Sequence, residues 1–134
     1  MKPCAIAAVT MLLLLGCNTA GPSDGASVIE ELRAQNIEVR EIDRIAETAL
    51  GVPMVVYAVP GGELQVYGYP TEDAAAAAAA SISADGMKIG TSAPLWIGPP
   101  HFFRRGETIV NHLGEGADVL AALRRILGPP IAGR

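Results

Sequence analysis

The sequence predicts an α+β domain built on a single antiparallel sheet of about five or six strands with about three helices. Short runs rich in β-branched residues are separated by Gly and Pro, which is typical of antiparallel strands. Other segments have helical spacing or helix-forming composition. The sequence contains a weak internal repeat. In residues 62–73, and again in residues 106–118, a Gly-Glu pair begins a strand and an Asp follows near the start of a helix. This repeat suggests two ββα units with their helices on one face of the sheet.

The first predicted helix begins at Ser27, because Ser27-Val28-Ile29-Glu30 matches a capping box. We expect the helix to end near Gln35. Ile37 to Ile42 then predicts a first strand, and residues 44–52 are compatible with a loop or a helical turn.

A hairpin is predicted next. Met54 to Val59 is a β-branched apolar run, Pro60-Gly61-Gly62 is a turn, and Glu63 to Tyr69 alternates. The alternation assigns the side chains of the second strand to two opposite faces: Leu64, Val66 and Gly68 on one, and Gln65, Tyr67 and Tyr69 on the other.

The second helix is predicted from Thr71, an N-cap residue followed by Glu72 and Asp73 in the first turn. Seven consecutive alanines follow, Ala74 to Ala80. Alanine is the best helix former, and its small side chain lets a helix lie close against a sheet. We therefore expect an ordered helix here, without chemistry of its own.

The C-terminal part predicts a short strand, a hairpin and a third helix. Ala93 to Ile97 is the expected strand, and His101 to Arg104 is expected to pair with Thr108 to Leu113. Ala117 to Leu127 has apolar residues three and four apart, which predicts an amphipathic helix. Gly128-Pro129-Pro130 ends it.

The N-terminus carries an export signal. Lys2 precedes an apolar segment, Ala5 to Leu15, of about 17 Å as a helix, which is short for a bilayer core of about 30 Å. Leu14-Leu15-Gly16-Cys17 follows and resembles the lipobox of bacterial lipoproteins. The resemblance implies cleavage between Gly16 and Cys17 and lipid attachment to Cys17, with an uncleaved anchor or an ordinary signal as the alternatives.

The chain therefore divides into a signal peptide (1–16), a lipidated flexible tether (17–26) and a small domain (27–134). We expect the domain to be exported and to be held by the lipid on Cys17 at the bacterial cell membrane or outer membrane, on the extracytoplasmic side. Two or three acyl chains hold a protein stably on a bilayer.

Charge and cysteine content narrow the function classes. Ten basic and 14 acidic side chains give a net charge of −4, so no nucleic-acid partner is expected. Cys4 leaves with the signal and Cys17 carries the lipid, so no cysteine remains for a disulfide, a thiolate nucleophile or a zinc–sulfur site. No cofactor motif is present, and we expect a non-catalytic domain.

Several phrases are similar to those of an uncharacterised family of small bacterial lipoproteins. They are VYGYP, ISADGMKIGTS, LWIGPPHFFRRG, IVNHLG and ILGPPIAGR, and together they cover roughly Gly62 to Arg134. The sequence departs from the family pattern at Asn111-His112 and at Pro130-Ile131. The resemblance implies an exported domain and carries no activity with it.

An interaction patch is the first candidate site. Large rings gather between Trp96 and Phe103, and aromatic side chains anchor many interfaces. Phe102 and Phe103 point to opposite faces of a strand, so one of them or His101 could be exposed. The alternative is that these rings fill the core. The candidate patch consists of Trp96, His101, Phe102, Phe103 and Arg104.

A small envelope hydrolase or metal-binding enzyme is the alternative function. It would use His101, His112 and Asp118, because imidazoles and carboxylates bind zinc and a bound metal activates water. The two histidines belong to no recognisable ligand motif, so no metal site is assigned from the sequence. The partner expected first is the membrane, with an envelope protein or a small molecule as a further possibility.

Overall fold

One six-stranded antiparallel sheet organises the protein in a computed structural model, which describes residues 24–133. The predicted signal peptide, Cys17 and most of the predicted tether lie outside the described residues. The strands are β1 (Arg40–Ile45), β2 (Met54–Val59), β3 (Gly62–Gly68), β4 (Pro100–Arg105), β5 (Thr108–Gly114) and β6 (Ala132–Gly133). Their order across the sheet is β1-β2-β3-β5-β4-β6. The predicted fold class is confirmed.

Helix α1 (Asp24–Ala34) begins earlier than predicted. Ser27 lies within its first turns instead of capping it, so the predicted capping box is wrong. The other end follows a known pattern, because Ile37 N–H donates to Leu32 O and Asn36 N–H to Arg33 O, with Asn36 at φ +62°. This is a Schellman ending with Asn in the left-handed position.

The predicted hairpins and the two later helices are present. β2 and β3 pair from Met54↔Tyr67 to Val59↔Gly62, and β4 and β5 pair across the turn at Gly106 and Glu107. α2 spans Glu72–Ala80, and Thr71 Oγ1 accepts from the Ala74 N–H as an N-cap should. α3 spans Ala117–Leu127.

The first strand and the predicted strand at Ala93 to Ile97 differ from expectation. β1 begins at Arg40, although Ile37 and Val39 before it are buried as the alternation indicates. Ala93 to Ile97 pairs with no strand and belongs to the long loop that joins α2 to β4. Pro94 removes one backbone donor from this segment, which disfavours sheet pairing.

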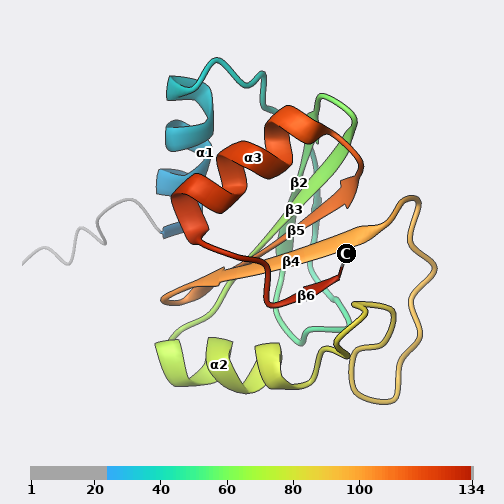
Figure 1. The fold of residues 1–134 in the computed structure, drawn as a ribbon. Coiled ribbons are helices and arrows are strands. Elements are labelled where there is room, and N and C mark those ends of the chain that lie inside the picture. The colour runs from blue at the N-terminus through green and yellow to red at the C-terminus, as the bar shows by residue number, and fades with distance from the viewer. Residues whose placement is uncertain (1–23, 134) are drawn as a thin grey trace, which may run out of the picture.

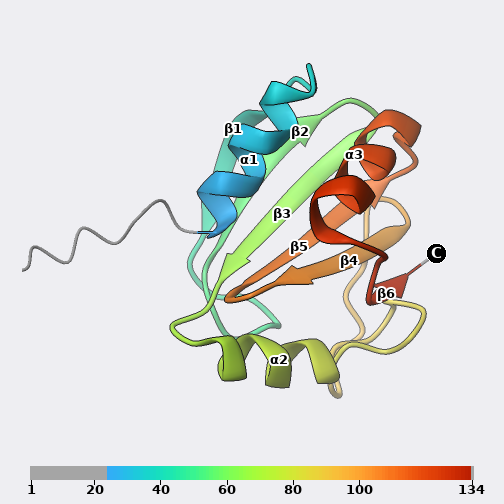
Figure 2. The same ribbon diagram turned by 60° about the vertical axis from the view of Figure 1, so that its left-hand side comes forward.

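The helices cover both faces of the sheet. Figures 1 and 2 show α1 and α3 side by side over one face and α2 on the opposite side. The first face packs Val28, Leu32 and Leu123 against Phe103 and its neighbours. Two ββα units follow one another along the chain, but the prediction that their helices share a face is wrong. Ala75 of α2 packs against the other face.

The central strands β4 and β5 are buried on both of their faces. Every residue of β5 is buried, and so are the first four residues of β4. The second face packs Tyr67, Phe102 and Ile109 against α2 and the loop that follows it. Each face therefore has its own apolar core.

Candidate functional site

The predicted interaction patch is not a continuous surface. Phe102 and Phe103 are both fully buried, each in the core of a different face, and His101 is 5% exposed. Arg104 is half-buried, with its guanidinium donating to Gly106 O and lying 3.9 Å from Glu72. The exposure predicted for one of these rings assumed a sheet that is covered on one face. This sheet has a core on each face and buries both phenylalanines.

Trp96 holds the long loop, residues 81–99, against the sheet. Its Nε1–H donates to Gly86 O at 3.0 Å, and its ring meets Phe102 edge-on at 5.9 Å between centroids. The loop is also closed internally, because Gly90 N–H donates to Ser81 O and Ser83 N–H to Lys88 O. Loop 81–99 is therefore ordered, although it contains no helix or strand.

Loop 81–99 presents large apolar side chains to solvent. Leu95 is 99% exposed, Ile97 is 74% exposed and Met87 is 46% exposed. Burial alternates along this segment, so Trp96 packs against the core while its two neighbours are exposed. Among the described residues, the backbone N–H groups of Leu95, Trp96 and Ile97 have no backbone partner. We call Met87, Leu95 and Ile97 the apolar ridge.

A small hollow lies beside the apolar ridge. It has a volume of about 190 Å³ and is lined by Asp85, Met87, Pro99 and Pro100. Asp85 accepts from the Ser83 hydroxyl and the Met87 N–H, which shape the turn and hold the pKa of this carboxyl below its usual range. The hollow is mostly apolar and continues the ridge toward β4.

The two histidines of the predicted enzyme site do meet. His101 and His112 are directly opposite each other on β4 and β5, with ring centroids 6.1 Å apart and planes 23° from parallel. They face α3, and both are buried. We call them the histidine pair.

Backbone carbonyls select the tautomer of each ring in the histidine pair. His101 Nε2 lies 3.1 Å from Gly114 O, and His112 Nδ1 lies 2.9 Å from Glu63 O. A carbonyl oxygen only accepts, so these two nitrogens carry the protons and donate. Among residues 24–133, the other ring nitrogens, His101 Nδ1 and His112 Nε2, have no hydrogen-bond partner. Burial lowers the pKa of both imidazoles.

Asp118, the third residue of the predicted enzyme site, does not join the histidine pair. It is exposed in the first turn of α3, where the helix dipole favours an acid. Within the described part of the chain, no three His, Cys, Asp or Glu side chains are grouped as metal ligands. The structure therefore brings together two of the three predicted residues.

Four glycines form a junction next to the histidine pair, where the turns before β3, before β4 and after β5 meet. A Cβ added at Gly114 would lie 2.1 Å from Gly61 O, and one at Gly116 would lie 2.4 Å from Pro60 O. A Cβ at Gly98 would lie 3.2 Å from Gly114 N. We call Gly61, Gly98, Gly114 and Gly116 the glycine junction; sequence reasoning missed it.

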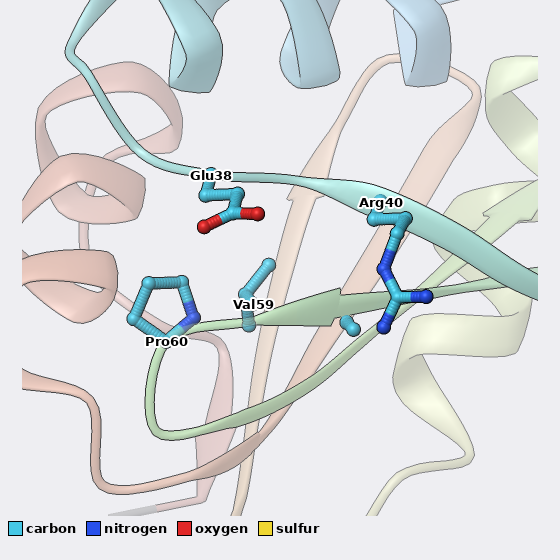
Figure 3. A pocket seen from close by; sticks show the side chains of 5 residues that line it. Glu38, Arg40, Val59 and Pro60 are labelled. Atoms are coloured by element: carbon cyan, nitrogen blue, oxygen red, sulfur yellow. The ribbon is translucent and has the colours of Figure 1, made fainter.

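An open groove of about 400 Å³ lies between the segment before β1 and the end of β2. Figure 3 shows Glu38 and Arg40 on one side and Val59 and Pro60 on the other. Glu38 and Arg40 are both exposed and of opposite sign, so the groove does not favour a ligand of either charge. It offers no grouping of catalytic side chains.

Comparison of the chain with protein-family models, with curated proteins and with solved structures finds no match. Between Asp24 and Gly133, none of the helices has the length and apolar character needed to cross a bilayer. The apolar ridge gathers three of the five large apolar side chains that are exposed in the described domain on one loop, and exposed apolar patches mark interaction sites.

Proposed function

We propose that this chain is an exported lipoprotein of the bacterial envelope whose domain binds another protein through the apolar ridge. The lipobox-like Leu14-Leu15-Gly16-Cys17 supports the anchoring. The single observation that carries the binding role is Leu95, a leucine 99% exposed on a loop that Trp96 holds in place. Holding Leu95 and Ile97 outward in advance lowers the ordering cost of binding.

The position of the ridge favours a protein over the anchoring membrane. Figures 1 and 2 place the start of α1 and loop 81–99 on opposite sides of the domain. The seven-residue step from Cys17 to Asp24 spans at most about 25 Å. A compact domain with the length of residues 24–133 is roughly 34 Å across. With Cys17 in the bilayer, the tether is too short to let the ridge turn toward the lipid.

The backbone and the alternating exposure of residues 95–97 indicate the form of the partner. Unpaired N–H groups and alternating apolar side chains are the features that allow an extended peptide to add alongside a strand. We therefore expect the partner to present an extended segment with apolar side chains. Such a contact combines backbone hydrogen bonds with the burial of Leu95 and Ile97.

Anchoring is tested by growing cells with labelled palmitate and expressing the wild-type chain, Cys17→Ala and Cys4→Ala. We expect label in the wild type and in Cys4→Ala, and none in Cys17→Ala. Cys4 is the matched control, because the chain holds just these two cysteines. Equal labelling of Cys17→Ala would contradict the lipid anchor.

Binding is tested in the same cells with a photocrosslinking amino acid at position 95, and at position 42 as the control. Ile42 is 45% exposed on β1, at the far edge of the sheet from β6. We expect a discrete protein adduct from position 95 that Ile97→Ser weakens, and none from position 42. Adducts to lipid alone, or equal adducts from both positions, would overturn the protein-binding role.

A further inference from the structure

The histidine pair is a buried titratable cluster of the described domain that the proposed function does not use. Adding a proton to either ring places it on His101 Nδ1 or His112 Nε2, which have no acceptor among the described residues. A buried donor without an acceptor costs the full desolvation of that group. The pair is therefore stable as two neutral rings and is poorly suited to carry charge.

Helix α3 adds to this preference for the neutral form. A Cβ placed on Gly116, the N-cap of α3, would lie 3.5 Å from His112 Nε2, so this nitrogen lies at the helix N-terminus. The N-terminus carries a partial positive charge that disfavours a cation beside it. The same field argues against a bound metal ion at this nitrogen and against imidazolium.

The charges around the pair give little compensation. His101 is influenced by the Arg124 guanidinium of α3, which opposes protonation, and by the Glu115 carboxylate, which favours it. Both side chains are exposed, so solvent screens them. From β3, the pair receives only the backbone carbonyl of Glu63. For His112, burial lowers the pKa most, and a charge on His101 lowers it further, so the first proton on the pair hinders the second.

The histidine pair is connected to the end of loop 81–99 through the glycine junction. His101 Nε2–H donates to Gly114 O, and Gly114 N–H donates to Pro99 O at 3.1 Å. Gly98 lies against the Gly114 backbone, where a Cβ would be 3.2 Å from Gly114 N and so in tight contact. Any movement of His101 away from Gly114 thus acts on the residues that lead directly from the apolar ridge into β4.

We propose that the histidine pair is an acid-sensitive switch whose protonation separates the Gly114 corner from Pro99 and thereby loosens the apolar ridge. The opening of the corner follows from the histidine pair alone. The control of partner binding rests on the proposed function of the ridge. The change occurs as the pH falls below about 6.5, the pKa of an unperturbed histidine.

The test uses the full chain in detergent micelles, titrated from pH 8 to pH 4.5. Ring ¹⁵N shifts are expected to show Nε2–H for His101 and Nδ1–H for His112 at neutral pH, with both midpoints below about 6.5. Exchange of the Gly114 N–H, corrected for intrinsic rates, should accelerate between pH 7.5 and pH 5, because one extra proton bound by the open form raises the opening constant by up to about tenfold per pH unit between the folded-state midpoint and about 6.5. The control is the Gly51 N–H, which donates to Thr48 O in the loop between β1 and β2 and should keep its corrected rate.

A matched double variant removes the titration and keeps the hydrogen bonds. His101→Gln retains a donor near the Nε2 position, and His112→Asn retains one near the Nδ1 position. This variant should keep the neutral-pH exchange rate and lose the acceleration. Trp96, the single tryptophan of the chain, reports the loop by its fluorescence, which should change with pH in the wild type alone.

Two outcomes would overturn the switch: a folded double variant with the wild-type acid response, or wild-type imidazoles with midpoints at or above about 6.5. If the double variant does not fold, the wild-type ring shifts and exchange rates still decide whether protonation of the histidine pair opens the Gly114 corner. Crosslinking from position 95 that is equal at pH 7.5 and pH 5 would remove the regulation and leave the binding role standing. Loss of crosslinking at both pH values would reject the binding role and leave the acid-induced opening standing.

Discussion

The two faces of strands β4 and β5 bury polar groups in contrasting ways. On the α2 face, Asn111 Nδ2–H donates to Gln65 Oε1, which also accepts from the Tyr67 hydroxyl, and Asn111 Oδ1 accepts from the His101 N–H. On the α3 face, His101 and His112 each make one hydrogen bond through the ring and leave one ring nitrogen buried without a partner.

This contrast determines which of the two clusters responds to pH. Amides do not titrate, and burial raises the pKa of the Tyr67 hydroxyl far above neutrality. We call Asn111, Gln65 and Tyr67 the Asn111 cluster. This cluster therefore keeps its hydrogen bonds at every physiological pH and holds β3, β5 and β4 in register. The histidine pair occupies the next register position, yet each ring can gain a proton for which the core has no acceptor.

The largest expected effects come from the two cores themselves. Phe103→Ala on the α3 face and Phe102→Ala on the α2 face should each lower the free energy of unfolding by about 3–5 kcal/mol. Both side chains are fully buried, so the costs should be similar. Urea unfolding of each variant measures them. A cost below about 1 kcal/mol for Phe102→Ala would mean that the α2 face is not a true core.

The glycine junction should be the next most sensitive position. Gly114→Ala adds a Cβ 2.1 Å from Gly61 O at a residue with φ +141°, and should cost about 3 kcal/mol from overpacking and backbone strain together. Gly51→Ala is the control, because Gly51 has φ +76° but nothing within 4 Å. Its cost should be limited to about 1–2 kcal/mol. Equal costs in thermal or urea unfolding would argue against the close contact.

Stability should fall on mild acidification because of the histidine pair. The folded-state pKa of both rings is lowered, so between that pKa and about 6.5 the unfolded chain binds more protons. Stability is complete above about 6.5 and declines as the pH falls, by at most about 2.7 kcal/mol per pH unit for two protons. Urea unfolding between pH 7.5 and pH 5 measures this. Removing both imidazoles in His101→Gln/His112→Asn should flatten the profile in this window.

How far the sequence predicts this pair depends on the register of one hairpin. The sequence predicts strands at 101–104 and 108–113 that pair across Arg105-Gly106, whereas the turn lies one residue later. The two-residue turn at Gly106 and Glu107 places His101 opposite His112. The tautomers depend on carbonyls at Glu63 and Gly114, which are tertiary contacts that local patterns do not encode.

The helices show a similar limit. α3 was located correctly, because its apolar residues recur at helical spacing. The alanine run of α2 has no wide apolar stripe, so its sequence does not indicate which face of the sheet it covers. The predicted strand at Ala93 to Ile97 had the composition of a strand, yet no neighbouring strand is in reach to pair with it.

A smaller effect is expected at the Asn111 cluster. Asn111→Ala removes the amide that bridges Gln65 and the His101 N–H, and leaves buried groups without partners. The free energy of unfolding should fall by about 1–3 kcal/mol. Unlike the histidine pair, this loss should be the same at pH 7.5 and pH 5.5, which urea unfolding at the two pH values measures. A pH-dependent loss would show that the two faces are coupled.

The apolar ridge should contribute least to stability. Leu95→Ser changes a side chain that is 99% exposed, and should alter the free energy of unfolding by no more than about 0.5 kcal/mol. Trp96→Phe is the informative neighbour, because it removes the Nε1–H that donates to Gly86 O and should cost about 0.5–1.5 kcal/mol. Thermal unfolding of both variants separates a side chain kept for contact with a partner from one that holds the loop. A Leu95→Ser protein as destabilised as Trp96→Phe would mean that Leu95 belongs to the core and not to a binding surface.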